Sequence, residues 1–366
     1  MNKIRVGILF GGKSAEHEIS LLSAKNVVDA LDKTKYEPVL IGIDKSGRWL
    51  MNTRSELLLN STNPKLIALN KANSESVALV PQSEGKLTSL DRGDLRQAVD
   101  VVFPILHGPC GEDGTVQGLL KLANIPFVGA GVLGSAVGMD KDVMKRLLRD
   151  AGVPIPKFLV FRYGEQPDFA AATRQLGLPL FVKPANLGSS VGISKVKDVA
   201  GFGAALGEAF RYDTKILIEA AIQGREIECA VLGNDAPIAS VPGEIIPNHE
   251  FYDYDAKYVD ENGARLEAPA KLPAETVIRV QEFAVRTFRV LECRGMARVD
   301  CFLQADGELL VNEINTIPGF TKISMYPRLW GLSGISYTQL IDRLIGLAFE
   351  SFARGQKLQT THAEHA

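Results

Sequence analysis

The sequence predicts an α/β fold in which a parallel, twisted sheet near the N-terminus is followed by two α+β units. Two observations support this prediction. Up to about residue 138, apolar runs of strand length alternate with helix-length segments, and strands that alternate with helices form parallel sheets. Beyond residue 139 the chain shows a strand, a glycine loop and a second strand, and strands then dominate, which favours α+β units.

The N-terminal elements follow from hydrophobic patterning. Apolar runs at residues 4–10, 39–43 and 99–105 have the length of buried strands, and residues 20–32 have the pattern of an amphipathic helix. Ligands bind outside the carboxyl ends of the strands in such sheets, so the turns after residues 10 and 105 are candidate binding loops. The segment 51–97 is polar and irregular and indicates no particular structure.

The later elements define the remaining units. A basic helix is expected over residues 140–150, where Gly152-Val-Pro154 stops it, and another helix over residues 337–351. We therefore divide the chain into an N-terminal α/β domain (1–138), a central unit (139–222), a C-terminal unit (223–354) and a polar tail (355–366).

Composition excludes several classes of protein. A chain of 366 residues is too long for one small core and suggests two or three domains. The net charge of −2 gives no indication of a nucleic-acid partner. The four cysteines are scattered, which is typical of reduced, intracellular proteins. Because no apolar stretch reaches about 18 residues, we expect a cytoplasmic protein without a membrane partner.

The most informative segment is a hairpin predicted around Asp306-Gly307. Asp-Gly between two apolar runs is a strong signal for a two-residue turn. Such a turn sets Asp300 opposite Glu313 and Arg298 opposite Asn315, with all four side chains on one face of the sheet.

These opposed side chains suggest a metal site. Directly opposed side chains have Cβ atoms roughly 4.5–5.5 Å apart, and like charges at that separation repel. Hard oxygen ligands so arranged suit Mg²⁺, which usually keeps several waters and is shared with substrate phosphates. The alternative is a solvated amphipathic hairpin, for which two carboxylates, an amide and an arginine in register have no obvious purpose.

Residues 7–14 match the Walker A pattern literally, which suggests a P-loop nucleotide site with Lys13 and Ser14. The context argues against it, because residues 8–10 are strand interior and the loop that remains is too short. The turn that follows offers Glu16 to a cleft. The alternative for Glu16 is a polar helix entry in which the carboxylate counters the helix dipole.

A better phosphate-binding candidate lies at residues 181–193. A strand delivers Lys183, and a Gly188-Ser189-Ser190 turn leads back into a second strand. Backbone amides and hydroxyls of such a turn can cover phosphates while the lysine supplies charge. A plain hairpin turn is the alternative. Lys141 is a second cation able to reach phosphate, or an ordinary surface charge.

Three further features are candidates without a firm role. Glu219 ends an apolar run, where a carboxylate commonly accepts hydrogen bonds from a ligand, although surface exposure explains it equally well. His107 opens a turn after the strand 99–105, which is the position of a binding turn in an α/β domain. Residues 251–258 are aromatic and charged, which suggests an ordered loop laid over a site.

Together these segments resemble the D-alanine–D-alanine ligase family of the ATP-grasp superfamily. The resemblance covers nearly the whole chain, and its most specific motifs are His107-Gly-x-x-Gly-Glu-Asp-Gly114 and Arg298-Val-Asp300 followed by Glu313-Ile-Asn315-Thr-x-Pro-Gly319. It implies an ATP-grasp fold, in which two α+β subdomains clasp ATP. It also implies ATP-dependent joining of two D-alanines through a D-alanyl phosphate, for synthesis of peptidoglycan precursors.

The resemblance further implies roles for single residues. Two Mg²⁺ ions, with Mn²⁺ as a substitute, are held by Asp300, Glu313 and Asn315. ATP is contacted by Lys141, Lys183, Ser190, Glu219, Glu226 and Lys257. Substrate is bound by His107 and by Ser324, the latter through the carboxylate of the second D-alanine. The residues that act on the reacting groups are Glu16, Ser189, Tyr258, Arg298 and Gly319. Of these, Glu16 holds the ammonium of the first D-alanine and is linked through Ser189 to Tyr258, whereas Arg298 and the Gly319 N–H stabilise oxyanion charge.

The alternatives that stay open are related activities and unrelated ones. A D-alanine–D-lactate or D-alanine–D-serine ligase resembles this chain elsewhere but lacks the pair Lys257-Tyr258, whose presence favours D-alanine. A P-loop NTPase and an inactive nucleotide-binding module are the unrelated candidates. Ala220-Ala221 differs from the family pattern beside Glu219, which leaves the packing of the adenine pocket open. The resemblance also implies a homodimer.

Overall fold

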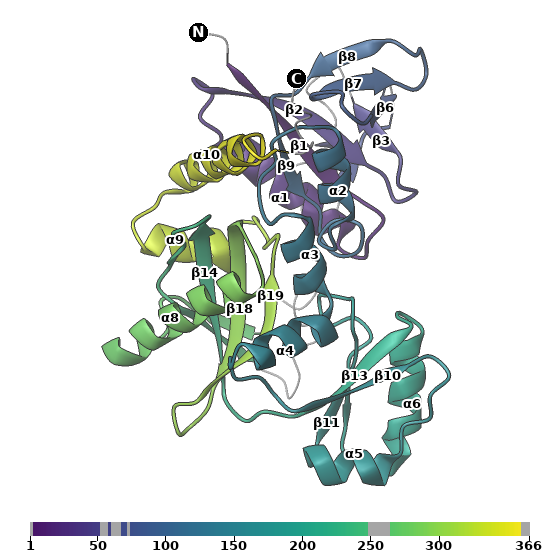
Figure 1. The fold of residues 1–366 in the computed structure, drawn as a ribbon, viewed down its shortest axis with the longest axis vertical. Coiled ribbons are helices and arrows are strands. Elements are labelled where there is room, and N and C mark those ends of the chain that lie inside the picture. Colours follow the sequence, from purple (N-terminus) through teal and green to yellow (C-terminus); the bar gives the residue numbers. More distant parts are fainter. Residues whose placement is uncertain (1–2, 52–57, 60–66, 72–73, 248–263, 360–366) are drawn as a thin grey trace, which may run out of the picture.

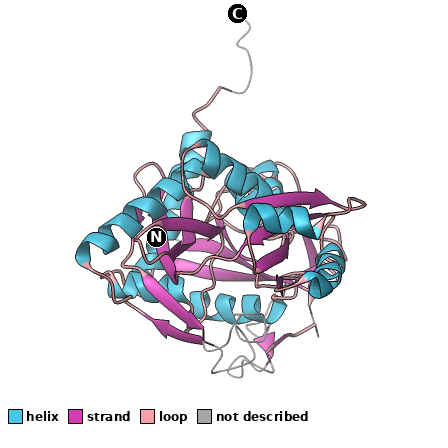
Figure 2. Cartoon of the chain, turned by 90° about the horizontal axis from the view of Figure 1, so that it is seen from below, coloured by secondary structure: helices cyan, strands magenta, loops and turns pink. Residues whose placement is uncertain are grey.

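The computed structural model describes residues 3–51, 58–59, 67–71, 74–247 and 264–359, and Figure 1 shows their arrangement. Three main sheets follow one another along the chain. Figure 2 shows helices arranged around the strands of these sheets. Among the helices described, none is long and apolar enough to cross a bilayer.

The N-terminal sheet is mixed rather than parallel. Its strand order is β8-β7-β6-β3-β2-β1-β9. Strand β1 runs parallel to its neighbours β2 and β9, and the remaining described pairs are antiparallel. The prediction of a parallel sheet is therefore right for three strands and wrong for the others. The strands are β1 (Ile4–Gly11), β2 (Tyr36–Ile43), β3 (Trp49–Met51), β6 (Glu75–Leu79), β7 (Lys86–Ser89), β8 (Leu95–Ala98) and β9 (Val101–Ile105).

The polar segment after residue 50 explains why the sheet is mixed and not wholly parallel. Strands β6 and β7 bury alternate residues, including Val77, Leu79 and Leu87, so part of the segment has the period of half-buried strands. A further pair, β4 (Leu58–Leu59) and β5 (Ala68–Leu69), forms a separate two-stranded sheet. Short strands with many polar residues carry a weak sequence signal, which is why none was expected over residues 51–97.

Both ends of the chain contribute to the core of the N-terminal sheet. Helix α1 (His17–Ala30) buries Leu21 and Val27 against the sheet, and α10 (Tyr337–Gly355) buries Leu340 and Leu344 in the same cluster. Each such side chain contributes roughly 1.5–3 kcal/mol when fully buried. Figure 1 shows α10, in yellow, beside the purple strands. The last helix therefore fastens the C-terminal part of the chain to its first sheet.

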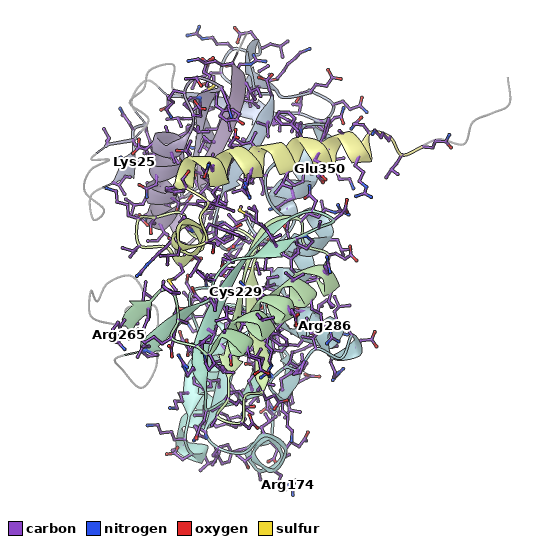
Figure 3. The ribbon with its side chains drawn as sticks, turned by 90° about the vertical axis from the view of Figure 1, so that its left-hand side faces the viewer. Lys25, Arg174, Cys229, Arg265, Arg286 and Glu350 are labelled. Atoms are coloured by element: carbon purple, nitrogen blue, oxygen red, sulfur yellow. The ribbon has the colours of Figure 1, made fainter. Side chains whose placement is uncertain are left out.

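The central sheet is antiparallel, with strand order β10-β13-β11-β12. The predicted strand, glycine loop and strand are β11 and β12 with the turn between them. Helix α2 (Thr115–Leu122) buries Val116 and Leu120 in the core of the N-terminal sheet. The elements that follow along the chain are α3 (Val132–Met139), α4 (Lys141–Asp150), β10 (Phe158–Arg162), α5 (Phe169–Leu176), β11 (Leu180–Pro184), β12 (Ser194–Val196), α6 (Val199–Phe210) and β13 (Lys215–Ala220). Figure 3 shows that Arg174 on α5 lies at the opposite end of the molecule from Lys25 on α1.

The C-terminal sheet carries the predicted hairpin. Its strand order is β17-β16-β14-β18-β19, with β15 paired to β14. Cys229 of β14 is buried and Arg286 of α8 is exposed, and Figure 3 labels both. The elements are β14 (Arg225–Gly233), β15 (Ile238–Ala239), β16 (Gly243–Pro247), β17 (Ala264–Glu267), α8 (Ala274–Val290), β18 (Gly295–Leu303), β19 (Leu309–Asn315) and α9 (Met325–Leu332).

Helix α8 corrects our expectation that strands dominate from residue 224 to the last helix. Its buried residues are Val280, Ala284, Thr287 and Phe288, which lie on one helical face. That spacing is present in the sequence and predicts a helix. The three helices that were expected lie close to their predicted ranges: α1 covers His17–Ala30, α4 begins after the cap residue Asp140, and α10 extends four residues past 351. No range was predicted for α2, α3, α5, α6 or α9.

Candidate active site

The predicted pairing on the C-terminal hairpin is confirmed. Asp300 pairs with Glu313, and Arg298 pairs with Asn315, across β18 and β19. The turn itself differs from the prediction. Gln304 N–H donates to the Glu308 carbonyl at 2.9 Å, which leaves three residues in the loop, and of Asp306 and Gly307 only Gly307 has a positive φ (+87°).

A β-bulge restores the predicted register. Cys301 pairs with Val311 while Asp300 pairs with Glu313, so Asn312 is an extra residue on β19. The longer turn shifts the ladder by one residue, and the bulge shifts it back. The four side chains therefore reach the predicted face of the sheet by a different route.

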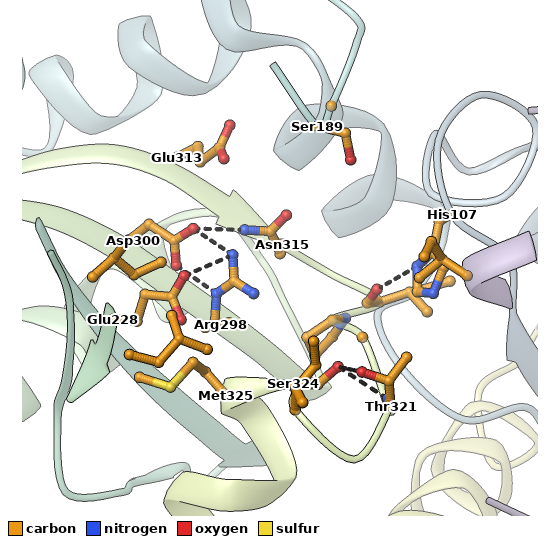
Figure 4. A pocket seen from close by; sticks show the side chains of 18 of the residues that line it. His107, Ser189, Glu228, Arg298, Asp300, Glu313, Asn315, Thr321, Ser324 and Met325 are labelled. Atoms are coloured by element: carbon orange, nitrogen blue, oxygen red, sulfur yellow. Dashed lines mark hydrogen bonds and ion pairs between the residues drawn. The ribbon is translucent and has the colours of Figure 1, made fainter. Parts of the chain in front are cut away.

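Arg298 is the centre of a charged network on this face (Figure 4). Its Nε and Nη2 donate to the two oxygens of Asp300, each at 2.7 Å. Its Nη2 also lies 3.2 Å from Glu228 Oε1. Asn315 Nδ2 donates to Asp300 Oδ2 at 2.9 Å. Burial would lower the pKa of Arg298, but the carboxylates of Asp300 and Glu228 outweigh it and raise the pKa well above its usual value.

Glu228 was not assigned a role from the sequence. It is 4% exposed and lies on β14 directly opposite Asp300. A usable signal existed, because Glu226 and Glu228 alternate on a strand and therefore share a face. Glu226 and Glu228 both line the same pocket as Asp300.

The chemistry of the donor set fits a divalent cation. Asp300 and Glu313 carry carboxylate oxygens, and the amide of Asn315, whose Nδ2 donates to Asp300, has a carbonyl oxygen as a possible third donor atom. Within the described ranges, no group of three or more His, Cys, Asp or Glu side chains forms a metal cage. Two carboxylates and an amide suit Mg²⁺, which is commonly bound by one or two carboxylates plus waters and substrate phosphates.

The pocket around this network has a volume of about 590 Å³. It brings together residues from α1, the turn after β9, the β11–β12 turn and the C-terminal hairpin. The predicted site residues that line it are Glu16, His107, Ser189, Glu226, Arg298, Asp300, Glu313, Asn315, Gly319 and Ser324. Lys257 and Tyr258 lie outside the described residues.

Glu16 and Ser189 meet across the pocket although they are far apart in the sequence. Glu16 precedes the first turn of α1, and Ser189 Oγ donates to Glu16 Oε1. Ser189 and Ser190 have φ angles of +52° and +59°, which residues other than glycine rarely adopt. Such backbone conformations cluster at functional sites, which is consistent with a turn that holds Ser189 toward Glu16.

His107 and Ser324 lie in the same pocket. The His107 Nδ1 is 3.1 Å from the Ile317 carbonyl oxygen, and burial lowers the pKa of His107, so the imidazole is neutral near pH 7. Ser324 Oγ accepts a hydrogen bond from Thr321 N–H at 2.9 Å. A Cβ atom at position 319 would lie 2.8 Å from Ser324 Oγ, so only glycine allows this approach.

The predicted cations occupy two places. Lys141 Nζ donates to the Leu187 carbonyl at 2.6 Å and lies 3.6 Å from Glu313 Oε2, which links the β11–β12 turn to the hairpin. Lys183 Nζ donates to Glu219 Oε2 at 2.6 Å. The structure therefore brings Lys141 to the carboxylates and sets Lys183 beside Glu219.

Lys145 is a second residue that was not expected from the sequence. It is fully buried, and its Nζ lies 3.0 Å from Glu219 Oε1. Burial lowers the pKa of Lys145. Burial would raise the pKa of Glu219, but Lys145 and Lys183 outweigh it and lower the pKa to about 2. Lys141 and Lys145 are four residues apart on α4, a spacing that puts both on one helical face.

These features define an ATP-grasp enzyme, with a central sheet and a carboxylate-bearing C-terminal sheet on either side of α4 (Figure 1). Family models described as D-ala D-ala ligase N-terminus and C-terminus match residues 5–130 and 147–346. The chain belongs to the D-alanine–D-alanine ligase family.

Individual relatives match over nearly their full length. The chain is 56% identical over 364 residues to a D-alanine–D-alanine ligase of Shouchella clausii, covering 99% of each chain. It is 53% identical to D-alanine–D-alanine ligase A of Escherichia coli K12, covering 99% of this chain and 100% of the relative. Among solved structures, the D-alanine–D-alanine ligase of Coxiella burnetii superposes with a TM-score of 0.86 at 40% identity, covering 98% and 97% of the two chains. The D-Ala:D-Ser ligase VanG of Enterococcus faecalis superposes with a TM-score of 0.83 at 37% identity, covering 95% and 100%.

Proposed function

We propose that this protein joins two D-alanines to D-alanyl-D-alanine, with conversion of ATP to ADP and phosphate, for peptidoglycan precursors. The observation that carries the proposal is one pocket containing both the Arg298–Asp300–Glu313 face and the Glu16–Ser189 contact. The first suits phosphoryl transfer and the second suits an amino-acid ammonium.

The first D-alanine is bound by the turn after β1. The Glu16 carboxylate faces the substrate ammonium, and Ser189 fixes the carboxylate through its hydroxyl. By the family resemblance, Tyr258, which lies outside the described residues, is expected to join this pair. His107 stays neutral and so does not repel the ammonium. The α-carboxylate is thereby directed to the nucleotide.

ATP is held between the central and C-terminal sheets. Its phosphates face Lys141, Lys183 and the backbone and hydroxyl of Ser190, while Glu219, Glu226 and Lys257 face the nucleoside. Asp300, Glu313 and Asn315 would hold the divalent cations, for which we expect two Mg²⁺ with Mn²⁺ as a substitute. When bound, these ions neutralise phosphate charge. The substrate carboxylate attacks the γ-phosphorus, and ADP leaves with the electrons of the broken P–O bond.

Peptide-bond formation follows in the same pocket. Ser324 holds the carboxylate of the second D-alanine, whose neutral amine attacks the carbonyl of the D-alanyl phosphate. Arg298 and the Gly319 N–H donate to the oxyanion that develops. Phosphate leaves and the amine loses a proton. Acyl phosphates hydrolyse readily, so the Ser189 turn and Tyr258 act by excluding water.

The test is D-alanine-dependent release of ADP with stoichiometric dipeptide. A chain that hydrolyses ATP without D-alanine, or binds nucleotide without turnover, would not be this ligase. Lys13→Ala separates it from a P-loop NTPase, because Gly7 and residues 8–10 lie inside β1. We expect Lys13→Ala to leave nucleotide affinity unchanged and Lys183→Ala to lower it.

A second candidate is ligation of D-alanine to D-serine, the activity named for VanG, which is 37% identical to this chain, whereas the D-alanine–D-alanine ligases above are 53% and 56% identical. Product analysis with competing D-alanine, D-serine and D-lactate at neutral pH distinguishes these reactions. We expect D-alanyl-D-alanine as the main product, and predominant depsipeptide or D-alanyl-D-serine would contradict that expectation.

We also propose that the protein is a cytoplasmic homodimer. The support is the family resemblance together with a substrate, ATP, that is found inside the cell. Sedimentation velocity at micromolar concentration tests the dimer, and a single species at 39.7 kDa, the mass of one chain, would overturn it.

A further inference from the structure

A third acidic residue continues the row formed by Asp300 and Glu313. Glu228 on β14 pairs with Asp300 on β18, and Asp300 pairs with Glu313 on β19. Directly opposed residues in antiparallel sheets present their side chains on the same face. Three carboxylates therefore lie side by side across three strands, and the proposed ligation assigns no task to Glu228.

Glu228 contacts Arg298 from β14, which flanks β18 on the side away from β19, the strand of Glu313. The Glu228 Oε1 lies 3.2 Å from Nη2 of Arg298, and only 6% of the Glu228 side chain is exposed. The same nitrogen also donates to Asp300 at 2.7 Å. Figure 4 shows the guanidinium beside both carboxyl groups. Arg298 is therefore shared between two carboxylates.

The sharing has a consequence for catalysis. Asp300 uses both oxygens to accept from Arg298, yet the proposed function asks its oxygens to bind a divalent cation. Each carboxylate oxygen has about two acceptor sites, and Asp300 Oδ2 already accepts from both Arg298 and Asn315, so a cation bound at that oxygen would displace one of these donors. If Arg298 loses one of its hydrogen bonds to Asp300, its buried guanidinium needs another anion as a partner. A buried charge without a partner destabilises the protein.

We propose that Glu228 is a positioning residue that keeps the Arg298 guanidinium charge-balanced and aimed at the reacting carbonyl when Asp300 serves the metal and phosphates. This inference rests on the proposed function. Glu228 acts through Arg298 and touches neither substrate nor metal. Its removal slows the step that Arg298 assists and leaves nucleotide and metal binding in place.

The experiment compares Glu228→Gln with a matched control. Glu244→Gln removes another buried carboxylate of the same sheet, which pairs with Arg225 at 2.6 and 2.8 Å outside the pocket. We expect Glu228→Gln to lower kcat by about 10- to 100-fold with KM for ATP changed by about twofold or less, as for loss of a transition-state interaction. Glu244→Gln should leave kcat within about twofold of wild type, because breaking an ion pair outside the pocket affects stability alone.

A double-mutant cycle shows whether Glu228 acts through Arg298. In the Arg298→Lys background, Glu228→Gln should lower kcat by about twofold or less, because the group it positions is already lost. Additive losses would overturn the proposal. Glu228→Asp keeps the charge and should retain a larger part of the wild-type kcat than Glu228→Gln. If Glu228→Gln folds poorly, Glu228→Asp takes its place in the comparison.

A binding measurement gives a readout that does not depend on turnover. Mn²⁺ with ADP, followed by electron paramagnetic resonance, should bind Glu228→Gln within about threefold of wild type, a change below 1 kcal/mol. A loss of tenfold or more would make Glu228 a metal ligand and contradict the inference. If the wild-type protein itself forms no dipeptide from D-alanine and ATP, the proposed function fails, which is a different result from equal rates in wild type and Glu228→Gln.

Discussion

Asp300 lies directly opposite Glu313 on neighbouring antiparallel strands, and this pairing is maintained by two compensating irregularities. A three-residue turn shifts the ladder by one position, and the bulge at Asn312 shifts it back. Bulges are over-represented next to active sites, where they aim side chains. The two carboxylates are thus held close on rigid strands, at the cost of mutual repulsion that a cation relieves.

Loss of either carboxylate should lower turnover by about 10²-fold or more, because each is an expected ligand of the charge that neutralises the phosphates. Their effects on stability should differ. Glu313 is 24% exposed and lies 3.6 Å from Lys141, and its neutralisation also relieves repulsion from Asp300. Because the two effects oppose each other, Glu313→Gln should change the free energy of unfolding by about 1 kcal/mol or less. Asp300→Asn loses charged hydrogen bonds from Arg298 and should cost about 2–3 kcal/mol.

Denaturant unfolding without nucleotide or metal measures this difference. Equal destabilisation by Asp300→Asn and Glu313→Gln would contradict the paired network around Asp300. Full activity in either variant would contradict the metal assignment.

Arg298→Lys should lower the rate of peptide-bond formation without weakening the binding of ATP. Lysine keeps the charge but cannot donate from the planar fork that now engages both oxygens of Asp300. We expect kcat to fall by about 10²–10³, as for loss of one oxyanion donor. The affinity for ATP, measured by calorimetry with a non-hydrolysable analogue, should change little. A parallel fall in affinity would instead make Arg298 a phosphate ligand.

Much of this site could be predicted because strand alternation depends on short-range sequence. Two apolar runs and one turn were sufficient to pair Asp300 with Glu313, even though the turn type was wrong. The prediction survived because the bulge, which has no clear sequence signal, corrected the turn. Ser189 and Glu16 meet through tertiary packing, and only the family resemblance predicted their contact.

The roles of Glu228 and Lys145 were not predicted for a different reason. Glu228 alternates with Glu226 on a strand, and Lys145 lies in the basic helix expected over residues 140–150. Sequence patterns alone do not distinguish such charged residues from surface charges. Their burial depends on partners from other elements, Arg298 of β18 and Glu219 of β13. Helix α8 was not predicted although its sequence carries the helical period, so that error was one of interpretation.

The buried Lys145–Glu219–Lys183 group should give stability a specific pH dependence. The pKa of Glu219 falls from its usual 4.5 to about 2 in the fold. A carboxyl group with a lowered pKa stabilises the fold above its unfolded pKa, and this contribution is lost as pH falls from about 4.5 to about 2. Glu219→Gln leaves two ammonium groups without their carboxylate and should cost about 3–5 kcal/mol at pH 7.

The measurement is the free energy of unfolding of wild type and Glu219→Gln between pH 7 and pH 2.5. The difference between the two proteins should be constant down to about pH 5 and shrink below it. A difference that stays constant to pH 2.5 would show that Glu219 is not held ionised by the lysines.

Ser189 and Ser190 offer a matched pair for testing the contact between the β11–β12 turn and Glu16. Both have φ angles in the left-handed region, +52° and +59°, so replacement by alanine carries a similar backbone cost at each position. The hydroxyl that donates to Glu16 Oε1 is that of Ser189. A hydrogen bond to a charged group contributes about 1.5–3 kcal/mol, so Ser189→Ala should raise KM for the first D-alanine by roughly 10- to 100-fold. Ser190→Ala should act on KM for ATP instead. Steady-state kinetics with each substrate varied, and the ratio of ADP to dipeptide, distinguish the two. If both variants raise KM for D-alanine equally, the shape of the turn and not the Ser189–Glu16 hydrogen bond positions the substrate.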